Sequence, residues 1–250
     1  MIADRRFGGV DRLFGLGGSQ RIRDAHVAIV GVGGVGSWVA ESLARSGVRK
    51  LTLIDFDQVA DSNINRQIHA TGSSVGQAKV LAMRERIESF FPECQVNCVE
   101  EFAESGNWPA LLPVGVNAVV DACDQTSAKT VIAAWAMKSK CIHVVVGAAG
   151  GKRHAQLVEV ADMAEVTHDP LLAKVRYQLR KDHDAPRESK KMGISCIFSR
   201  ESVAPPDVSC AVMGDGTLNC HGFGSLVTVT ATFGQCAAGV VLNKLAEEFK

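Results

Sequence analysis

The sequence of 250 residues predicts an α/β fold built on a doubly wound, mostly parallel sheet. Three observations predict it. Short apolar runs alternate with helix-compatible stretches as far as about residue 148, and a glycine-rich turn joins the first run to the helix after it. Charged and polar residues follow several of these runs, where parallel strands would end. Because the pattern loosens after Gly150, we expect a Rossmann-like core with a C-terminal elaboration.

The individual elements follow from local pattern. The run at 26–30 is apolar and ends at a glycine, as a buried parallel strand does. Gly47 and Pro92 are stop signals for the helices that precede them. Strands are expected at 26–30, 51–54, 96–99, 118–122, 143–146, 156–160 and 196–198, and helices at 18–24, 37–46, 75–90, 127–138 and 171–181.

The chain is expected to form a single domain over residues 1–250. It divides into an N-terminal arm (1–25), a nucleotide-binding core (26–150) and a substrate-side extension (151–250) that contains a polar loop at 182–193 and a final apolar helix. No internal repeat or low-complexity tract interrupts it.

Composition excludes several classes of protein. Hydrophobic residues make up 46% of the chain, which argues against disorder, and 27 basic residues balance 27 acidic ones, which argues against a polycation. Aromatic residues make up only 6%, which disfavours an aromatic platform for single strands. None of the eight cysteines forms a C-x-x-C pair, so neither a zinc knuckle nor a disulfide scaffold is indicated, and we expect a reducing, cytoplasmic location.

Residues 222–242 are 21 uncharged residues, long enough to cross a membrane. Their Gly, Thr, Ser and Gln content makes the segment only moderately apolar. We therefore expect a helix buried in the core or in a dimer interface, with membrane association through 222–242 as the alternative.

The glycine turn follows the first strand and opens a helix. Free N–H groups and the positive dipole end of a helix attract phosphate, and glycines allow it to approach the backbone. The spacing fits G-x-G-x-x-G, and Asp55 follows the last of these glycines by 19 residues, where a carboxylate can hold ribose. The predicted nucleotide-binding glycines are Gly31, Gly33, Gly34 and Gly36.

Residues beyond Asp55 indicate which nucleotide is bound. Arg66 and Lys79 lie 13 residues apart, and such cations suit a triphosphate better than a nicotinamide. Asp124 lies just beyond the fourth predicted strand, where a carboxylate can bind Mg²⁺. The structural alternatives are surface solvation for Arg66 and Lys79 and a helix N-cap for Asp124.

In this order and spacing, G-x-G-G-x-G, D-F-D, N-x-N-R-Q, G-Q-x-K and D-x-x-D resemble the ubiquitin-activating-enzyme-like adenylating superfamily. The resemblance covers nearly the whole chain and implies carboxylate activation by ATP in a homodimer. It implies that an arginine is lent by the partner's N-terminal segment, for which Arg12 fits best, with an ordinary exposed arginine as the alternative. It places Asp57 and Gln67 beside the nucleotide, and Asn63, Arg66 and Lys79 at the phosphates. It also places Mg²⁺ on Asp124. Whether a monovalent cation is needed stays an open question.

The branch is indicated by further motifs, among them Gly147 to Gly151, Asp169-Pro170 and Cys220-His-Gly-Phe-Gly224. These are similar to the tRNA threonylcarbamoyladenosine dehydratases, which implies ATP-dependent cyclisation of the modified adenosine beside the anticodon through a carboxyl-adenylate. Two alternatives stay open: adenylation of the C-terminus of a ubiquitin-like sulfur-carrier protein, and, from the glycine turn and Asp55 alone, an NAD-dependent oxidoreductase.

An RNA substrate should leave a basic surface. Seven basic residues against three acidic ones lie between Lys174 and Lys191, a local net charge of +4. Candidate RNA contacts are Lys152, Arg153, Lys174, Arg176 and Arg180, with a solvated helix face as the alternative.

Cysteine chemistry is a further expectation. Cys196, Cys210 and Cys220 lie in the less regular half of the chain, where a thiol could be exposed. The resemblance links this branch to sulfur relay with a cysteine desulfurase or a sulfur-acceptor protein, which makes Cys220 the candidate sulfur acceptor.

Overall fold

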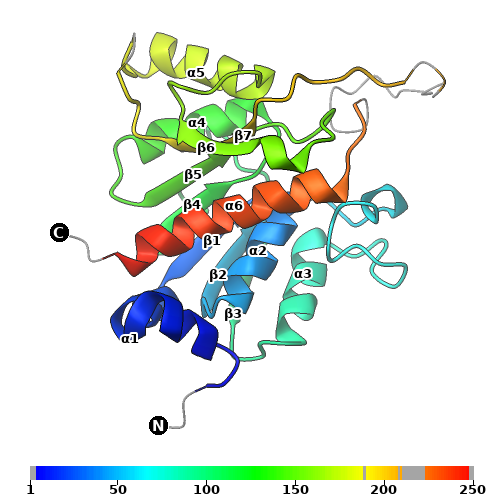
Figure 1. The fold of residues 1–250 in the computed structure, drawn as a ribbon, viewed down its shortest axis with the longest axis vertical. Coiled ribbons are helices and arrows are strands. Elements are labelled where there is room, and N and C mark those ends of the chain that lie inside the picture. Colours follow the sequence, from blue (N-terminus) through cyan, green and yellow to red (C-terminus); the bar gives the residue numbers. More distant parts are fainter. Residues whose placement is uncertain (1–3, 188–189, 208, 210–222, 248–250) are drawn as a thin grey trace.

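The computed structural model describes residues 4–187, 190–207, 209 and 223–247. They form a seven-stranded sheet in the order β3-β2-β1-β4-β5-β7-β6, flanked by helices on both faces (Figure 1). The strands are β1 (His26–Val30), β2 (Lys50–Ile54), β3 (Gln95–Val99), β4 (Ala118–Asp121), β5 (Ile142–Val146), β6 (Val158–Asp162) and β7 (Ser195–Ser199). All neighbouring pairs are parallel except β6 and β7, which confirms the predicted fold class.

The order of the strands reverses at β1, which lies between β2 and β4. The connection from β1 leads to β2 on one side, while β4 and β5 follow on the other side. In sheets of this kind the usual ligand position is at the carboxyl ends of the strands where the order reverses, here β1 and β4. The glycine turn follows β1 directly, so it lies at this point.

The helices are α1 (Gly8–Asp24), α2 (Gly36–Arg45), α3 (Lys79–Glu88), α4 (Thr126–Ala136), α5 (Pro170–Asp182) and α6 (Val227–Ala246), with short 3₁₀ turns at Asp61–Asn63 and Ala155–Leu157. Side chains of α2, α3 and α6 join one face of the core, while α4 and α5 pack together on the other. Figure 1 shows α6 crossing the sheet beside α2.

The starts of the first and third predicted helices differ most from the prediction. The first helix begins at Gly8 rather than at 18, with a kink at Gly15, whose φ is +70°; its glycines hid the helical pattern. The third helix begins at Lys79 rather than at 75, because the N–H of Val59 donates to the carbonyl of Gln77 at 2.8 Å and a β-bridge joins Gln58 to Ala78. Residues 72–76 form a turn and Ala78 pairs with Gln58, so the helix starts only at Lys79.

The predicted burial of the last apolar segment is confirmed for the described part that lies in α6. Val229, Phe233, Ala237 and Val241 are fully buried at helical spacing. Gly234 allows close contact with α2, since a Cβ there would lie 2.6 Å from the Cβ of Trp38. Within the described residues, no helix has the length and apolar character needed to cross a membrane.

Candidate active site

The glycine turn closes on itself at the start of α2. Gly31 has φ +85°, which favours glycine, and its N–H donates to the carbonyl of Ile54 at 2.8 Å. A Cβ on Gly36 would lie 1.8 Å from the carbonyl oxygen of Gly31, so no side chain fits there. A Cβ on Gly33, in contrast, would meet nothing nearer than the Gln67 amide at 4.0 Å. Gly33 is therefore the open side of the turn.

Asp55 connects the glycine turn to the end of β2. Its carboxylate accepts the N–H of Val32 at 2.6 Å and that of Asp57 at 2.8 Å. Burial raises the pKa of Asp55, while the Lys79 charge and the two N–H donors act in the opposite direction. Asp55, which is predicted to bind the ribose, therefore also shapes the turn.

Lys79, the first residue of α3, reaches the same edge. Its ammonium lies 2.6 Å from the carboxylate of Asp57 and its side chain is only 9% exposed, against 54% for Asp57. Its backbone N–H also donates to the carbonyl of Asp57 at 3.0 Å. The structure therefore pairs the predicted phosphate-binding lysine with the second carboxylate of the D-F-D motif, which holds the ammonium beside Asp55.

Arg66 lies against the third glycine of the turn. A Cβ on Gly34 would lie 3.4 Å from the Arg66 side chain. The indole N–H of Trp38 donates to the Arg66 carbonyl at 3.0 Å. The Arg66 guanidinium donates to the carbonyl of Ser62 at 2.6 Å, so it is oriented within its own loop.

Two further predicted residues shape this loop. Asn63 is buried, and its side-chain oxygen accepts the N–H of Ala60 at 3.2 Å, which closes the turn that leads to Arg66. Gln67 is also buried, and its side-chain oxygen has no hydrogen-bond partner among the described residues. These two amides therefore bring the loop against Gly33 and Gly34.

Asp124 lies in the turn after β4, on the other side of Gly31. The N–H of Cys123 would be 2.8 Å from a Cβ on Gly31, so this turn and the glycine turn are in contact. Asp124 is exposed, and α4 begins at Thr126 with Gln125 as its N-cap, so Asp124 does not cap that helix. The structure thus brings Asp124 to the glycine turn with an exposed carboxylate.

A fully buried ion pair, for which the sequence contains no local signal, supports this turn. Lys129 donates to the carboxylate of Asp121 at 3.0 Å, and both side chains are inaccessible. The thiol of Cys123 also donates to Asp121, at 2.9 Å. Burial opposes the charge on Lys129, but Asp121 outweighs it and the pKa of Lys129 is raised. The ammonium therefore stays charged beneath the site.

A Mg²⁺ ion bound to the phosphates of the nucleotide would fit this edge of the sheet. Among the described residues, no three His, Cys, Asp or Glu side chains gather into a metal cage. Mg²⁺ commonly takes one or two protein carboxylates and completes its shell with phosphates and water. Asp124 is such a carboxylate, and it lies beside a turn suited to phosphate.

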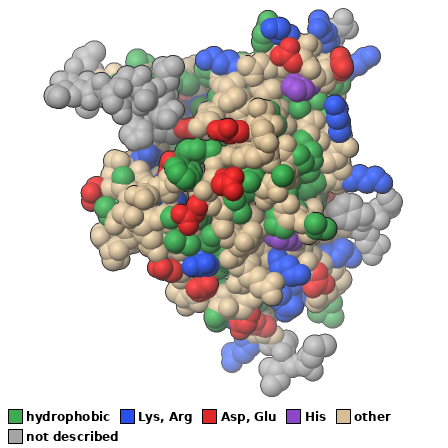
Figure 2. Space-filling model, turned by 180° about the vertical axis from the view of Figure 1, so that it is seen from behind, with side chains coloured by type: hydrophobic (Ala, Val, Ile, Leu, Met, Phe, Trp, Pro, Cys, Tyr) green, Lys and Arg blue, Asp and Glu red, His purple; other side chains and the backbone are tan. Residues whose placement is uncertain are grey.

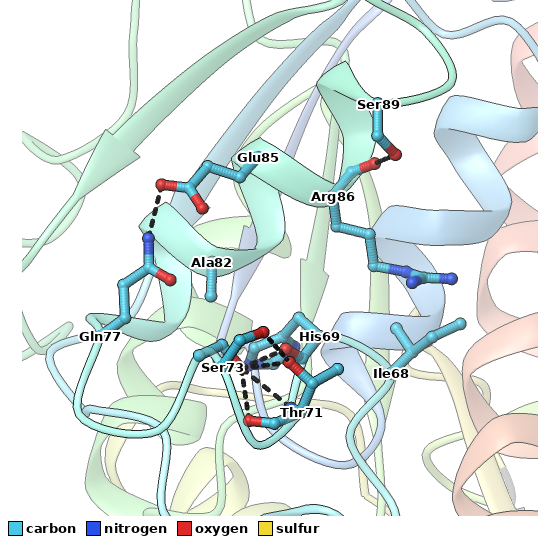
Figure 3. Close-up of a pocket in the computed structure, with 10 residues that line it drawn as sticks. Ile68, His69, Thr71, Ser73, Gln77, Ala82, Glu85, Arg86 and Ser89 are labelled. Atoms are coloured by element: carbon cyan, nitrogen blue, oxygen red, sulfur yellow. Dashed lines mark hydrogen bonds between the residues drawn. The ribbon is translucent and has the colours of Figure 1, made fainter.

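A pocket of about 200 Å³ lies behind the loop that carries Arg66, between residues 68–77 and α3 (Figure 3). Several of its polar groups pair with one another, since Ser74 donates to the carbonyl of His69 at 2.8 Å and Gln77 donates to Glu85 at 2.6 Å. Both ring nitrogens of the buried His69 have no hydrogen-bond partner among the described residues. Burial, helped by the charges of Lys79 and Arg86, lowers the pKa of His69 to about 4. The predicted nucleotide-binding residues do not line this pocket.

Arg12 lies far from the glycine turn of its own chain. It is exposed on α1, and Gly18 of the same helix packs against Ala246. At the other end of α6, Thr230 contacts the Arg66 carbonyl at 3.5 Å. The sixteen residues from Thr230 to Ala246 separate these contacts by about 24 Å, at about 1.5 Å per residue.

The predicted RNA contacts divide into exposed and internal residues. The prediction for Lys152 is wrong, because the residue is only 2% exposed and is not a surface cation. Its ammonium donates to the carbonyls of Ser199 and Glu201 at 3.0 and 3.2 Å. Arg153 and Lys174 are exposed. 

Arg176 and Arg180 are half-buried and hold neighbouring backbone. Arg176 donates to the carbonyls of Met163 and Val166, and Arg180 to that of Pro186. Their guanidinium groups are thus partly committed to the fold.

The expected exposure of Cys196 is wrong, because β7 is a central strand and the residue is fully buried. Burial raises the pKa of each described cysteine, to about 12 for Cys94 and about 11 for Cys141. The candidate sulfur acceptor Cys220 and its neighbour Cys210 lie outside the described residues.

The fold and the site define a nucleotide-binding α/β protein whose glycine turn is surrounded by two cations and several carboxylates, the class to which adenylating enzymes belong. The family model described as the ThiF family matches residues 9–248. The chain belongs to the ThiF family.

Two relatives that match nearly the whole chain are tRNA threonylcarbamoyladenosine dehydratases. The chain is 39% identical to the tRNA threonylcarbamoyladenosine dehydratase of Haemophilus influenzae, with 98% of this chain and 95% of the relative covered. It is 41% identical to that of Escherichia coli, with 96% and 93% covered. The solved Escherichia coli enzyme in complex with ATP has a TM-score of 0.88 at 40% identity, covering 98% of this chain and 96% of that chain.

The comparisons do not favour the sulfur-carrier alternative. The molybdopterin-synthase adenylyltransferase of Escherichia coli is 33% identical, but the match covers only 55% of each chain. A second solved form of the Escherichia coli dehydratase, in complex with AMP, has a TM-score of 0.87 and covers 98% of this chain.

Proposed function

We propose that this protein catalyses ATP-dependent dehydration of N6-threonylcarbamoyladenosine in tRNA, beside the anticodon. The observation that carries the proposal is the match over nearly the whole chain to a dehydratase solved with ATP and with AMP. The site supports it, because Lys79, Arg66 and the start of α2 all meet at the glycine turn.

The reaction takes place in two nucleophilic displacement steps. The threonyl carboxylate attacks the α-phosphorus of ATP, and pyrophosphate leaves, so the carboxylate becomes a mixed anhydride with AMP. A nucleophilic atom of the same threonylcarbamoyl group then attacks the acyl carbon, loses its proton and expels AMP, which carries away one carboxylate oxygen. The net change in the tRNA is the loss of one water. Because ring closure is intramolecular, no covalent enzyme intermediate is required.

Each residue has a proposed role that follows from its position. Asp55 would accept the ribose hydroxyls, and the N–H groups near Gly33 would face the phosphates. The Lys79 ammonium would leave the Asp57 carboxylate and pair with the phosphates, and Arg66 would neutralise the charge of the leaving pyrophosphate. Asp124 would hold Mg²⁺, which supplies charge neutralisation at the phosphates when bound.

A homodimer would complete the site. The helix that carries Arg12 packs at the Ala246 end of α6, about 24 Å along α6 from the contact of Thr230 with the Arg66 carbonyl. Arg12 would therefore act on the phosphates from a partner subunit. A sulfur relay through Cys220, a cysteine desulfurase partner, a monovalent cation and a cytoplasmic location stay predictions.

The test is mass spectrometry of nucleosides from tRNA that carries threonylcarbamoyladenosine. Wild-type protein with ATP and Mg²⁺ should convert the nucleoside to one lighter by a single water and should release AMP, whereas Lys79→Ala should do neither. AMP release that depends on a small carrier protein, with tRNA unchanged, would contradict the proposal.

Nucleotide choice has its own test. ATP at a hundred times its Kd should stabilise the fold by about 2.7 kcal/mol and raise the Tm, and NAD should not. Stabilisation by NAD alone would support the oxidoreductase alternative.

A further inference from the structure

We infer that the exposed face of α5, formed by Lys174, Tyr177 and Lys181, is the surface that binds the RNA backbone of the substrate. The inference rests on the proposed function, because it assigns a place to the RNA that this function requires. It keeps Lys174 from the sequence prediction and replaces Arg176 and Arg180, the other two contacts predicted on this helix, with Tyr177 and Lys181.

The helix has two faces of different character. Leu172, Val175 and Leu179 are fully buried and pack on the sheet and α4. Residues 174, 177 and 181 follow the same spacing of three and four on the opposite side, and all three are exposed. The face that is left to solvent therefore presents two lysines with an aromatic ring between them.

Tyr177 is the single tyrosine of the chain, and it is 66% exposed. A tyrosine usually covers its ring and leaves only its hydroxyl in water. In protein–RNA contacts the same side chain stacks on bases or donates to phosphate oxygens. An exposed ring flanked by two cations thus fits a nucleic acid better than an apolar protein surface.

The half-buried arginines make this face rigid. Arg176 ties α5 to the carbonyls of Met163 and Val166 at 3.0 and 2.8 Å. Arg180 ties it to the loop after the helix through the carbonyl of Pro186 at 3.1 Å. These contacts anchor the helix, while Lys174 and Lys181 stay exposed to solvent.

The face begins at the edge of the sheet that holds the glycine turn. Asp169, the N-cap of α5, accepts the N–H of Leu172 at 3.0 Å and that of Ala148, just beyond β5, at 2.9 Å. From Lys174 to Lys181 the helix runs about 10 Å away from this edge, at about 1.5 Å per residue. An RNA whose modified base enters the site can thus lay its backbone along α5.

Charge is unevenly distributed, although the whole chain is neutral. The described part of 170–193 has five exposed cations, Lys174, Lys181, Arg187, Lys190 and Lys191, against exposed Asp182 and Asp184. Figure 2 shows Lys and Arg at the top of the molecule, the end at which Figure 1 places α5, with Asp and Glu among them and further Lys and Arg along the right side. A polyanion is the partner that such a strip fits.

The test compares two double variants of equal charge change. Lys174→Glu with Lys181→Glu alters the α5 face, and Lys138→Glu with Lys140→Glu alters two exposed lysines between α4 and β5, at the opposite edge of the sheet. The α5 variant should weaken tRNA binding roughly tenfold or more and flatten the log–log salt dependence by about 1.4–1.8, that is 0.7–0.9 per lost contact. Its KM for ATP and its kcat at saturating tRNA should stay near wild type, and the control variant should bind tRNA like wild type.

Tyr177→Ala provides an independent readout. It should raise the KM for tRNA without changing the salt slope, because the side chain is neutral. Arg176→Ala should lower the Tm and leave the slope unchanged.

The outcomes distinguish the two proposals. Wild-type dehydration of tRNA with an unchanged slope and affinity in the α5 variant would overturn this inference alone. Failure of the wild type to dehydrate tRNA would overturn the function. Competition by an acidic polypeptide but not by bulk RNA would show a protein-binding face and would also overturn the inference.

Discussion

Gly36 and Gly33 of the same turn differ in the space around them. Alanine at Gly36 therefore tests the stability of the fold, and alanine at Gly33 tests ATP binding. A Cβ at Gly36 would lie 1.8 Å from a backbone oxygen, whereas one at Gly33 would have nothing within its contact distance except the Gln67 amide at 4.0 Å. We predict that Gly36→Ala destabilises the fold by at least about 3 kcal/mol, because backbone must move. Gly33→Ala should change stability by less than about 1 kcal/mol but should weaken ATP binding, since the methyl group occupies the open side of the turn.

Urea unfolding and calorimetric ATP titration would measure both effects. Equal loss of stability in the two variants would contradict the packing described for Gly36. Unchanged ATP affinity in Gly33→Ala would move the phosphates away from Gly33.

Asp124 is exposed at the edge of the site, so its side chain contributes little to packing. We predict that Asp124→Asn abolishes AMP formation, with a loss of about a hundredfold or more in kcat, and keeps the Tm within about 2 °C of wild type, because only a metal ligand is lost. Steady-state AMP release over a range of Mg²⁺ concentrations is the measurement. Near-native turnover at saturating Mg²⁺ would show that Asp124 is not the metal ligand.

At the scale of the element, α6 is held against α2 by a glycine. A Cβ on Gly234 would lie 2.6 Å from the Cβ of Trp38 and 2.8 Å from the carbonyl of Val35, while one on Gly239 would meet nothing within 4 Å. We predict that Gly234→Ala costs about 1–3 kcal/mol through overpacking. Gly239→Ala in the same helix should instead stabilise the protein by about 0.5–1 kcal/mol, because alanine favours the helix.

The two α6 variants share one helix and one chemical change, so denaturant midpoints compare them directly. The effect of Gly234→Ala should extend to activity, because α6 begins beside the Arg66 carbonyl. A Gly234→Ala protein as stable as wild type would mean that α6 can shift away from α2 without loss.

At the scale of the whole molecule, two buried histidines make stability depend on pH. Burial lowers the pKa of His69 and of His143 to about 4. Below about pH 6.5 the unfolded chain binds a proton at each site and the folded chain does not until about pH 4. Stability is therefore full above pH 6.5 and falls as the pH drops towards 4, by about 2 kcal/mol per histidine at pH 5.

Urea unfolding at pH 5, 6 and 7 would measure this slope. The double variant His69→Leu with His143→Leu should show a flatter dependence over that range, since neither site can then titrate. A wild-type slope in the double variant would assign the pH dependence to other groups.

The proposed dimer has a complementation test. Arg12→Ala and Lys79→Ala should each be inactive alone. In a mixed dimer, one site takes Lys79 from the Arg12→Ala subunit and Arg12 from its partner, so one intact site remains. Exchange of the two variants should recover activity approaching half of wild type per mixed dimer. No recovery after demonstrated exchange would place Arg12 outside the site.

The sequence alone determined the order of strands and helices through the core, the glycine turn, and the residues Asp55, Arg66, Lys79 and Asp124 that gather around it. These follow from local signals, because strand and helix periodicity, turn glycines and motif spacing are properties of neighbouring residues. Parallel topology then brings the carboxyl ends of β1, β2 and β4 to one edge, so motifs that follow the strands meet there.

Only the tertiary structure decided what each charged side chain contacts. It buried Lys152 against two carbonyls, committed Arg176 and Arg180 to backbone, and paired Lys79 with Asp57. It also placed the Lys129–Asp121 pair under the site, and the helix that carries Arg12 at the far end of α6. Burial and ion pairing depend on residues distant in the chain, and a lysine in the core has the same local sequence signal as a lysine in water.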